Sequence, residues 1–342
     1  MKKILCAPVA LILLAAAIPA HAGLIINATF DSDLTTTEKT TITSAINVYE
    51  SLFSNSITVG IYFQGVSSGL GASSYYVYNE SYGTYYTGLI ANNANPTAIA
   101  DLNANGGNAN TNGGNNPVTG TGSIELKSAS TRVVDPTGSL GLSHAPQCQL
   151  TGSSGSFACG GVTGTDYDGL ISLNTGLTNP GSGNYSLLAV SEHEIDEVLG
   201  LGSALENISS TTNATYNSTF YSNAPAPEDL WRFASNGTTR SFSTNCATPT
   251  AAYFFLNAGT QLTQFNNACN GADFGDWAGG ATPQIQDAFG TSGSTPTLGV
   301  SEIDALTAIG YTLTSAVPEP STWVLLASSL GVLGLVKRRR NA

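Results

Sequence analysis

Basic side chains are scarce in this 342-residue chain, which carries 11 Lys and Arg against 23 Asp and Glu. Six of the basic residues lie at the two ends, in residues 2–3 and 337–340. Residues 23–316 therefore hold five basic side chains against 22 acidic ones, a formal charge of −17. A chain this acidic lacks the cations that nucleic-acid binding needs to neutralise phosphates. The composition argues against a nucleic-acid partner.

Histidine and methionine are rarer still, with three histidines and a single methionine, Met1. His21 lies in an N-terminal segment that we expect to be removed on export. Imidazole is the commonest metal ligand and a frequent general base. Any such chemistry in the exported protein must therefore use His144 or His193.

Residues 1–22 have the three parts of a secretory signal peptide. Lys2 and Lys3 precede an apolar run over residues 4–18, and Ala20-His21-Ala22 places small residues at a cleavage site. We expect the exported protein to begin near Gly23.

The other end of the chain also has three parts in order. The run Val-Pro-Glu-Pro-Ser precedes an apolar stretch over residues 323–336 and a basic stop at 337–340. Over residues 317–342 this resembles the PEP-CTERM sorting signal of Gram-negative bacteria. The resemblance implies processing by an exosortase and transient membrane insertion through residues 323–336. It also implies a location at the cell envelope, on the outer surface or outside the cell. The stretch is short for a permanent membrane anchor, which needs about 20 residues.

Four of the five cysteines lie beyond the signal peptide. An even number of cysteines in an exported chain favours disulfides, and no C-x-x-C spacing suggests a thiolate metal site. Four cysteines allow three pairings. We predict the sequential one, which closes short loops: Cys148–Cys159 and Cys246–Cys269.

One segment combines a histidine with two glutamates at helical spacing. At 100° per residue, His193, Glu194 and Glu197 share one side of a helix, and two other acidic residues take an edge that we expect to face water, namely Glu192 and Asp196. The opposite side carries a core stripe of Leu188, Ile195, Val198 and Leu199. Ligands at i and i+4 with a glutamate at i+1 are how zinc peptidases hold a metal and a base. The simpler alternative is a polar helix face with an ordinary i,i+4 bond between His193 and Glu197.

The run SEHEIDEVLGLGS resembles the active-site motif of the metzincin-type zinc peptidases, H-E-x-x-H-x-x-G-x-x-(H or D). The resemblance implies that His193 is a metal ligand, that Glu194 is the general base and that Gly200 ends the helix. The second histidine of the family is replaced by Glu197 and its third ligand by Ser203. The methionine of the turn beneath the metal in that family is also missing.

A metallopeptidase site needs three protein ligands and an open position. His193 and Glu197 supply two, and we predict Asp229 as the third, because it follows a proline-rich turn in a strand-like segment. Asp276 and His144 are the second and third candidates. One imidazole with carboxylates suits Zn²⁺ and also harder ions such as Mn²⁺ or Ca²⁺. The acidic composition is compatible with a structural Ca²⁺ as well.

After the signal peptide the chain begins with a strand–helix–strand pattern, as α/β sheet layers do. With the resemblance, this predicts an α+β fold: a metzincin-like catalytic domain with a twisted mixed sheet, an active-site helix and a loop-rich C-terminal part. We find no repeat, so residues 23–316 are predicted to form one domain. The expected strands are residues 23–30, 57–63, 123–134, 169–174, 228–233 and 252–256, with 169–174 as the edge that binds substrate. The other expected helices are residues 36–53, 96–102 and 301–309.

The favoured hypothesis is an exported, surface-sorted metal-dependent endopeptidase that acts on a peptide or protein substrate. Glu194 would take a proton from the attacking water and pass it to the leaving amine. The alternative is a noncatalytic envelope or extracellular-matrix protein with a degenerate peptidase fold. A tyrosine cluster in residues 75–86 adds a third hypothesis, a polysaccharide-associated matrix component.

Overall fold

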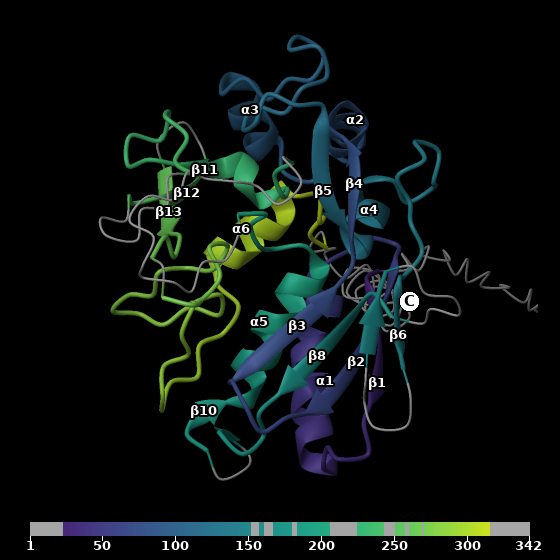
Figure 1. The fold of residues 1–342 in the computed structure, drawn as a ribbon, viewed down its shortest axis with the longest axis vertical. Helices are drawn as coiled ribbons and strands as arrows, with labels where there is room; N and C mark the ends of the chain where they lie inside the picture. Colours follow the sequence, from purple (N-terminus) through teal and green to yellow (C-terminus); the bar gives the residue numbers. More distant parts are fainter. Residues whose placement is uncertain are drawn as a thin grey trace, which may run out of the picture.

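The computed structural model describes residues 23–151, 157–160, 167–179, 183–205, 224–242, 250–256, 260–268 and 270–314. The signal peptide, the sorting tail and the predicted pair Cys246–Cys269 lie outside these described residues. Strands and helices dominate the N-terminal part of the chain, whereas the part after α5 consists mostly of loops and short elements (Figure 1).

A four-stranded mixed sheet lies at the centre of the N-terminal part, in the order β1-β2-β8-β3. Its strands are β1 Ile25–Phe30, β2 Thr58–Gly65, β8 Gly169–Leu173 and β3 Gly71–Tyr75. β1, β2 and β8 are parallel, and β3 runs antiparallel to β8. The edge next to β8 is therefore β3, and the expectation that residues 169–174 form the edge is wrong. β8 is almost wholly buried and apolar, as internal strands of parallel sheets are.

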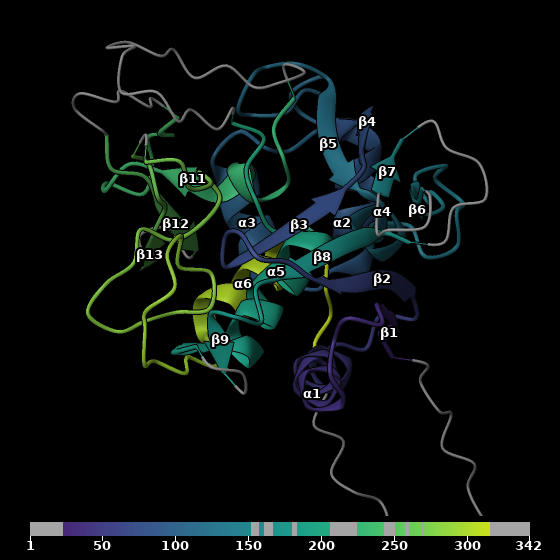
Figure 2. The same ribbon diagram turned by 60° about the horizontal axis from the view of Figure 1, so that its bottom comes forward.

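Two helices cover one face of this sheet (Figures 1 and 2). α1, Thr36–Leu52, begins at a capping box in which Thr35 and Glu38 each accept a backbone N–H from the other. α5, Leu187–Leu199, contacts α1, β3 and β8. The Tyr49 hydroxyl of α1 donates to the Glu192 carbonyl of α5 at 2.8 Å, so the two helices are joined inside the core.

Short elements surround this layer. Those between β3 and α5 are β4 Val77–Ser81, α2 Tyr82–Asn92, α3 Pro96–Ala104, β5 Ser123–Lys127, α4 Ser128–Val134, β6 Cys148–Leu150, β7 Phe157–Cys159, β9 Thr178–Asn179 and β10 Tyr185–Ser186. Those after α5 are the 3-10 helix η1 Glu228–Trp231, β11 Arg232–Phe233, β12 Tyr253–Leu256, β13 Thr260–Gln264 and α6 Val300–Ala308. The described part is thus a mixed α and β structure with several small sheets, compatible with the α+β class. None of its helices has the length and apolarity that crossing a membrane requires.

Two of the predicted strands are partly helical. Residues 123–134 divide into β5, which ends at Lys127, and the almost wholly buried helix α4, which begins at Ser128. Residues 228–233 begin as η1, because the carboxylates of Glu228 and Asp229 accept backbone N–H groups of neighbouring loops. The other predicted elements are present, with ends that differ by about two residues or fewer, as is usual for such boundaries.

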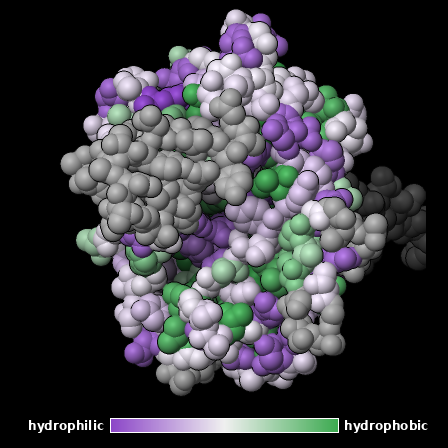
Figure 3. All heavy atoms as spheres, viewed as in Figure 1, coloured by the Kyte–Doolittle hydropathy of each residue, from purple (hydrophilic) through white to green (hydrophobic). Residues whose placement is uncertain are grey.

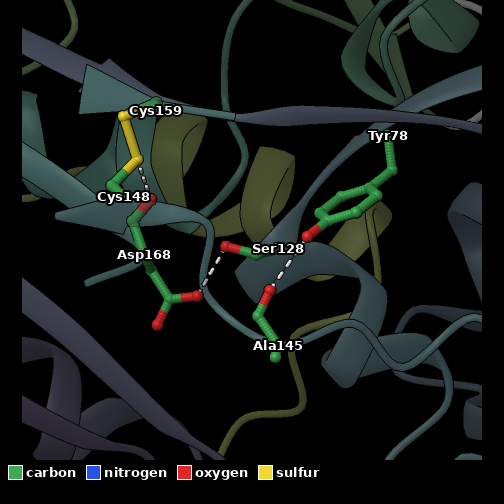
Figure 4. The surroundings of a disulfide bond; sticks show 6 residues. All are labelled: Tyr78, Ser128, Ala145, Cys148, Cys159 and Asp168. Atoms are coloured by element: carbon green, nitrogen blue, oxygen red, sulfur yellow. Dashed lines mark hydrogen bonds between the residues drawn. A yellow bond between two sulfur atoms is a disulfide. The ribbon is translucent and has the colours of Figure 1, made fainter. Parts of the chain in front are cut away.

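A disulfide and a buried ion pair lie side by side at the end of the sheet. Cys148 is bonded to Cys159, which confirms the first predicted pairing. Next to it, both oxygens of the Asp168 carboxylate accept from Arg132 Nη2 at 2.8 Å. The hydroxyl of Ser128 points toward the same carboxylate and donates to it at 2.5 Å (Figure 4). The ion pair connects α4 to the start of β8 within a water-poor environment.

We expect Arg132→Met to lower the free energy of unfolding by about 3 kcal/mol, because it leaves the buried Asp168 carboxylate without its cation. The double variant Arg132→Met/Asp168→Asn should recover at least half of this loss, since the neutral amide needs no counter-ion. Urea unfolding followed by circular dichroism measures both. Equal losses in the single and the double variant would show that the ion pair is not the source of the effect.

Candidate metal centre

The helix that carries His193 is well defined at both ends. At its start, the Ser186 hydroxyl accepts the backbone N–H of Ala189 at 3.2 Å. At its end, Gly200 has a φ of 141° and donates its N–H to the carbonyls of Asp196 and Glu197. A side chain at Gly200 would also lie 2.3 Å from the Ser130 hydroxyl, so this position requires glycine. The resemblance-based role of Gly200 in ending the helix agrees with this geometry.

Alternate residues of β3 face α5, as the period of a strand requires. A Cβ on Gly71 would come within 2.3 Å of Glu194 Oε1, so the absence of a side chain makes room for that carboxylate. Two residues later, the Ser73 hydroxyl donates a short hydrogen bond to Glu197 Oε2. Two residues further, the Tyr75 ring lies 3.6 Å from the ammonium group of Lys127. The edge strand therefore positions both glutamates of the motif.

His193 is oriented by a backbone carbonyl. Its Nδ1 lies 2.9 Å from the Ile285 carbonyl oxygen, which selects the tautomer with the proton on Nδ1. Its Nε2 then faces two carboxylates, 3.7 Å from Glu197 Oε1 and 3.9 Å from Asp276 Oδ1. Both distances are too long for hydrogen bonds. A nitrogen lone pair and two carboxylate oxygens thus converge on one point.

Asp276 reaches this point from a C-terminal loop that a buried arginine holds in place. Arg232 is fully buried and donates to the Phe274 carbonyl at 2.5 Å and to the Asn267 side-chain oxygen at 2.8 Å. The amide of Gln286 donates to Asp276 Oδ1 at 3.2 Å. These internal contacts fix the position of the Asp276 carboxylate relative to α5.

Lys127 fixes the end of α5 beneath the carboxylates. Its buried ammonium group donates to the carbonyls of Glu197 and Leu201, both at 2.6 Å. A cation at a helix C-terminus satisfies carbonyls that have no partner within the helix. Burial lowers the pKa of Lys127 to about 8, although nearby carboxylates oppose the shift. The sequence interpretation overlooked Lys127 and Arg232. The signal that could have found them is a basic residue in a strand-like segment of a chain poor in cations.

Burial changes the protonation of the whole cluster. Burial and the charge of Glu197 raise the pKa of Glu194, and burial raises the pKa of Asp276 to about 8. Burial also opposes ionisation of Glu197, but the nearby His193 and the charge of Lys127 lower its pKa to about 2. Burial disfavours a charged His193, yet the Asp276 and Glu197 carboxylates raise its pKa. Three carboxylates this close need positive charge among them, either protons or a divalent cation.

The donor set fits a divalent cation. The ligand atoms of His193, Glu197 and Asp276 all lie within 4.8 Å of one another, and the described residues contain no other such group of three. A tetrahedral zinc shell at about 2.1 Å separates its ligands by about 3.4 Å, so small side-chain rotations would close the site. The supporting bonds from Ile285, Ser73 and Gln286 are of the kind that orients metal ligands.

The structure does not bring Asp229 to the other two predicted ligands. Its Oδ1 accepts from the Ser203 hydroxyl at 2.6 Å, and its Oδ2 accepts from the backbone N–H groups of Ala204 and Ala226. Asp229 thus fastens the loop after α5, and Asp276, the second candidate, lies with His193 and Glu197 instead. His144 is also elsewhere, stacked on Tyr78 at 4.1 Å and 2.6 Å from Glu80 Oε1.

The expectation that Glu192 and Asp196 face water is wrong. They are 1% and 0% exposed, because α1 and α6 pack over this side of α5. Burial and the charge of Glu302 on α6 raise the pKa of Asp196, and burial raises the pKa of Glu192 to about 7. Helical spacing alone placed these residues on an edge, but it could not show that a second helix covers that edge.

A cleft of about 610 Å³ runs past the cluster. One wall is β3 with the preceding Gly69 and Leu70, the floor is α5, and the other wall is formed by two loop segments, 271–276 and 283–296. His193, Glu194, Glu197 and Asp276 all line it. In the space-filling view, hydrophilic residues lie in a hollow near α5, with hydrophobic residues beside it (Figure 3). A substrate of peptide size could therefore reach the cluster.

Comparison with known proteins bears on the end of the chain. The PEP-CTERM protein-sorting motif matches residues 316–340. The chain is therefore an exported, cell-surface protein of a Gram-negative bacterium, and an exosortase is its processing partner. No curated protein and no solved structure matches the chain. The metzincin resemblance consequently stays a hypothesis that rests on the motif and on the geometry of the site.

We expect Asp276→Asn to weaken zinc binding by about 100-fold or more, because it removes a charged ligand. Asp229→Asn should leave zinc affinity unchanged and should instead lower the free energy of unfolding by about 1–3 kcal/mol, since three donors lose a charged acceptor. Calorimetric zinc titration and urea unfolding separate the two effects. Loss of zinc in Asp229→Asn, with binding retained in Asp276→Asn, would contradict the assignment.

Proposed function

We propose that this exported protein is a metal-dependent endopeptidase, with His193, Glu197 and Asp276 as metal ligands and Glu194 as general base. The observation that carries the proposal is the convergence of one imidazole nitrogen and two carboxylate oxygens in a cleft, with a third carboxylate beside them. One histidine with two carboxylates suits Zn²⁺, and also Mn²⁺ or Ca²⁺. A structural Ca²⁺ stays a further hypothesis that the acidic composition supports.

The residues have distinct tasks in the proposed reaction. A bound divalent cation would polarise the scissile carbonyl and make a water molecule more acidic. Glu194 would accept the proton of the attacking water and then donate it to the leaving amine. Burial and the charge of Glu197 raise the pKa of Glu194. A raised pKa suits this carboxylate to its task, because a general base must both take and return a proton near neutral pH. Gly71 leaves the space in which this carboxylate can turn.

The edge strand supports a peptide as the substrate. β3 is paired with β8 on one side, and its other side borders the cleft. An extended peptide can add to such an edge through backbone hydrogen bonds. A peptide bound in this way would have a peptide bond, and not merely a side chain, alongside the cluster.

A noncatalytic envelope or matrix protein is the alternative. The observation that favours it is the replacement of a second imidazole by Glu197, which adds negative charge to the ligand set and weakens the metal as a Lewis acid. In this alternative the cation would only connect α5 to the C-terminal loops. The tyrosine cluster offers less support for a sugar-binding face, because Tyr82, Tyr85 and Tyr86 are buried.

We expect Glu194→Gln to bind zinc as the wild type does and to hydrolyse casein about 100 to 10,000 times more slowly, because the general base is lost. Metal analysis and casein digestion, with and without a chelator, measure the two properties. Glu80→Gln is the matched control, because it alters the glutamate beside the other histidine of the exported chain, His144, and should keep full activity.

Full hydrolysis by Glu194→Gln would rule out the role of this glutamate. Absence of chelator-sensitive hydrolysis in the wild type, with zinc bound, would leave the noncatalytic alternative.

A further inference from the structure

The two ends of the cleft differ in chemistry. Gly71 lies against Glu194 and Val190, and Ser73 lies against Glu197, so β3 and α5 run in the same direction. The end near Leu70 therefore coincides with the start of α5, and the end near Tyr75 coincides with its C-terminus. The metal cluster lies toward the second end, which divides the cleft into two halves.

The first half is apolar. It is lined by Leu70, Tyr185, Ala189 and two of the few large hydrophobic side chains that are exposed in the described part, Leu177 at 45% and Phe289 at 60%. A Cβ on Gly290 would lie 2.7 Å from Leu70 and 3.3 Å from Tyr185, so the loop closes this end of the cleft. Exposed apolar side chains that gather around one closed end mark a place for an apolar group of a ligand.

The second half is acidic. Glu197, Asp273 and Asp276 line it, and the Tyr75 ring borders them. The described residues that line the cleft include five carboxylates and neither lysine nor arginine. The nearby ammonium group of Lys127 is buried against backbone carbonyls and the Tyr75 ring. The three carboxylates of this half carry more charge than a divalent cation would neutralise, so the half stays negative.

We propose that the cleft selects extended peptides that carry a bulky apolar side chain on one side of the scissile bond and a basic side chain on the other. The apolar side chain would lie against Leu70, Leu177 and Phe289, and the basic side chain near Asp273, which lines the cleft and is not one of the three proposed metal ligands. An acidic side chain in place of the basic one would be repelled by the carboxylates of the second half. This inference rests on the proposed function and names its substrate class.

The test uses binding as well as cleavage. Fluorescein-labelled peptides of equal length carry Leu and Lys on either side of a central dipeptide, in both orders, with Ala in place of Leu or Asp in place of Lys as comparisons. Fluorescence anisotropy with the zinc-loaded full exported chain bearing Glu194→Gln gives dissociation constants without hydrolysis. We expect Leu/Lys peptides in one of the two orders to bind about tenfold more tightly than the Leu/Asp and Ala/Lys peptides of that order.

The origin of each preference is tested separately. Phe289→Ala should remove most of the preference for Leu over Ala, whereas Ile25→Ala, at another exposed apolar position outside the cleft lining, should keep it. Raising the salt concentration from about 0.05 to about 0.5 M should weaken the preference for Lys over Asp, because salt screens interactions between charges. The preference for Leu over Ala should stay unchanged. Equal binding of the Lys and Asp peptides at low salt, or an unchanged Leu preference in Phe289→Ala, overturns the inference.

Cleavage by the wild type distinguishes this inference from the proposed function. Selective binding without chelator-sensitive cleavage would overturn the peptidase assignment and keep the peptide specificity. Chelator-sensitive cleavage without selectivity would keep the peptidase assignment and overturn the peptide specificity. Failure of both binding and cleavage would overturn both.

Discussion

The packing of α5 against the edge strand β3 is the contact on which the candidate site depends. Because alternate strand residues point the same way, Gly71, Ser73 and Tyr75 all face the helix. The first makes room for Glu194, the second binds Glu197, and the third lies on the cation that holds the end of the helix. A shift of one residue in the pairing of β3 with β8 would turn all three away from α5, so strand register and site geometry are linked.

The scarcity of cations explains how they are used. Most surface charge of this acidic chain is negative, whereas Lys127, Arg132 and Arg232 are directed inward to carbonyls and carboxylates. Lys127 fixes the C-terminus of α5, and Arg232 fixes the loop that delivers Asp276. Buried cations with several acceptors are costly to disturb, because removing one leaves polar groups unpaired. The few basic residues therefore determine where the ligand-bearing segments meet.

Much of the fold could be predicted from local pattern. Apolar residues at helical spacing indicated α1, α5 and α6, and strands were predicted at the positions of β1, β2 and β8. The errors occur where distant contacts override propensity. Residues 128–134 are β-branched enough to suggest a strand but form α4, in which nearly every residue is buried by contacts with other segments. The edge strand β3 was overlooked because its small polar residues, GASSY, resemble a loop.

The sequence by itself determined that the chain is exported and sorted by its tail, and that His193, Glu194 and Glu197 share a helix face, because these properties depend on neighbouring residues. Only the tertiary structure decided that Asp276 joins His193 and Glu197 in one cluster. Asp276 lies far along the chain from α5, and its position depends on loop packing around Arg232, which local spacing does not encode. The packing of α1 and α6 against α5 likewise buried its acidic edge, which helical periodicity left open to water.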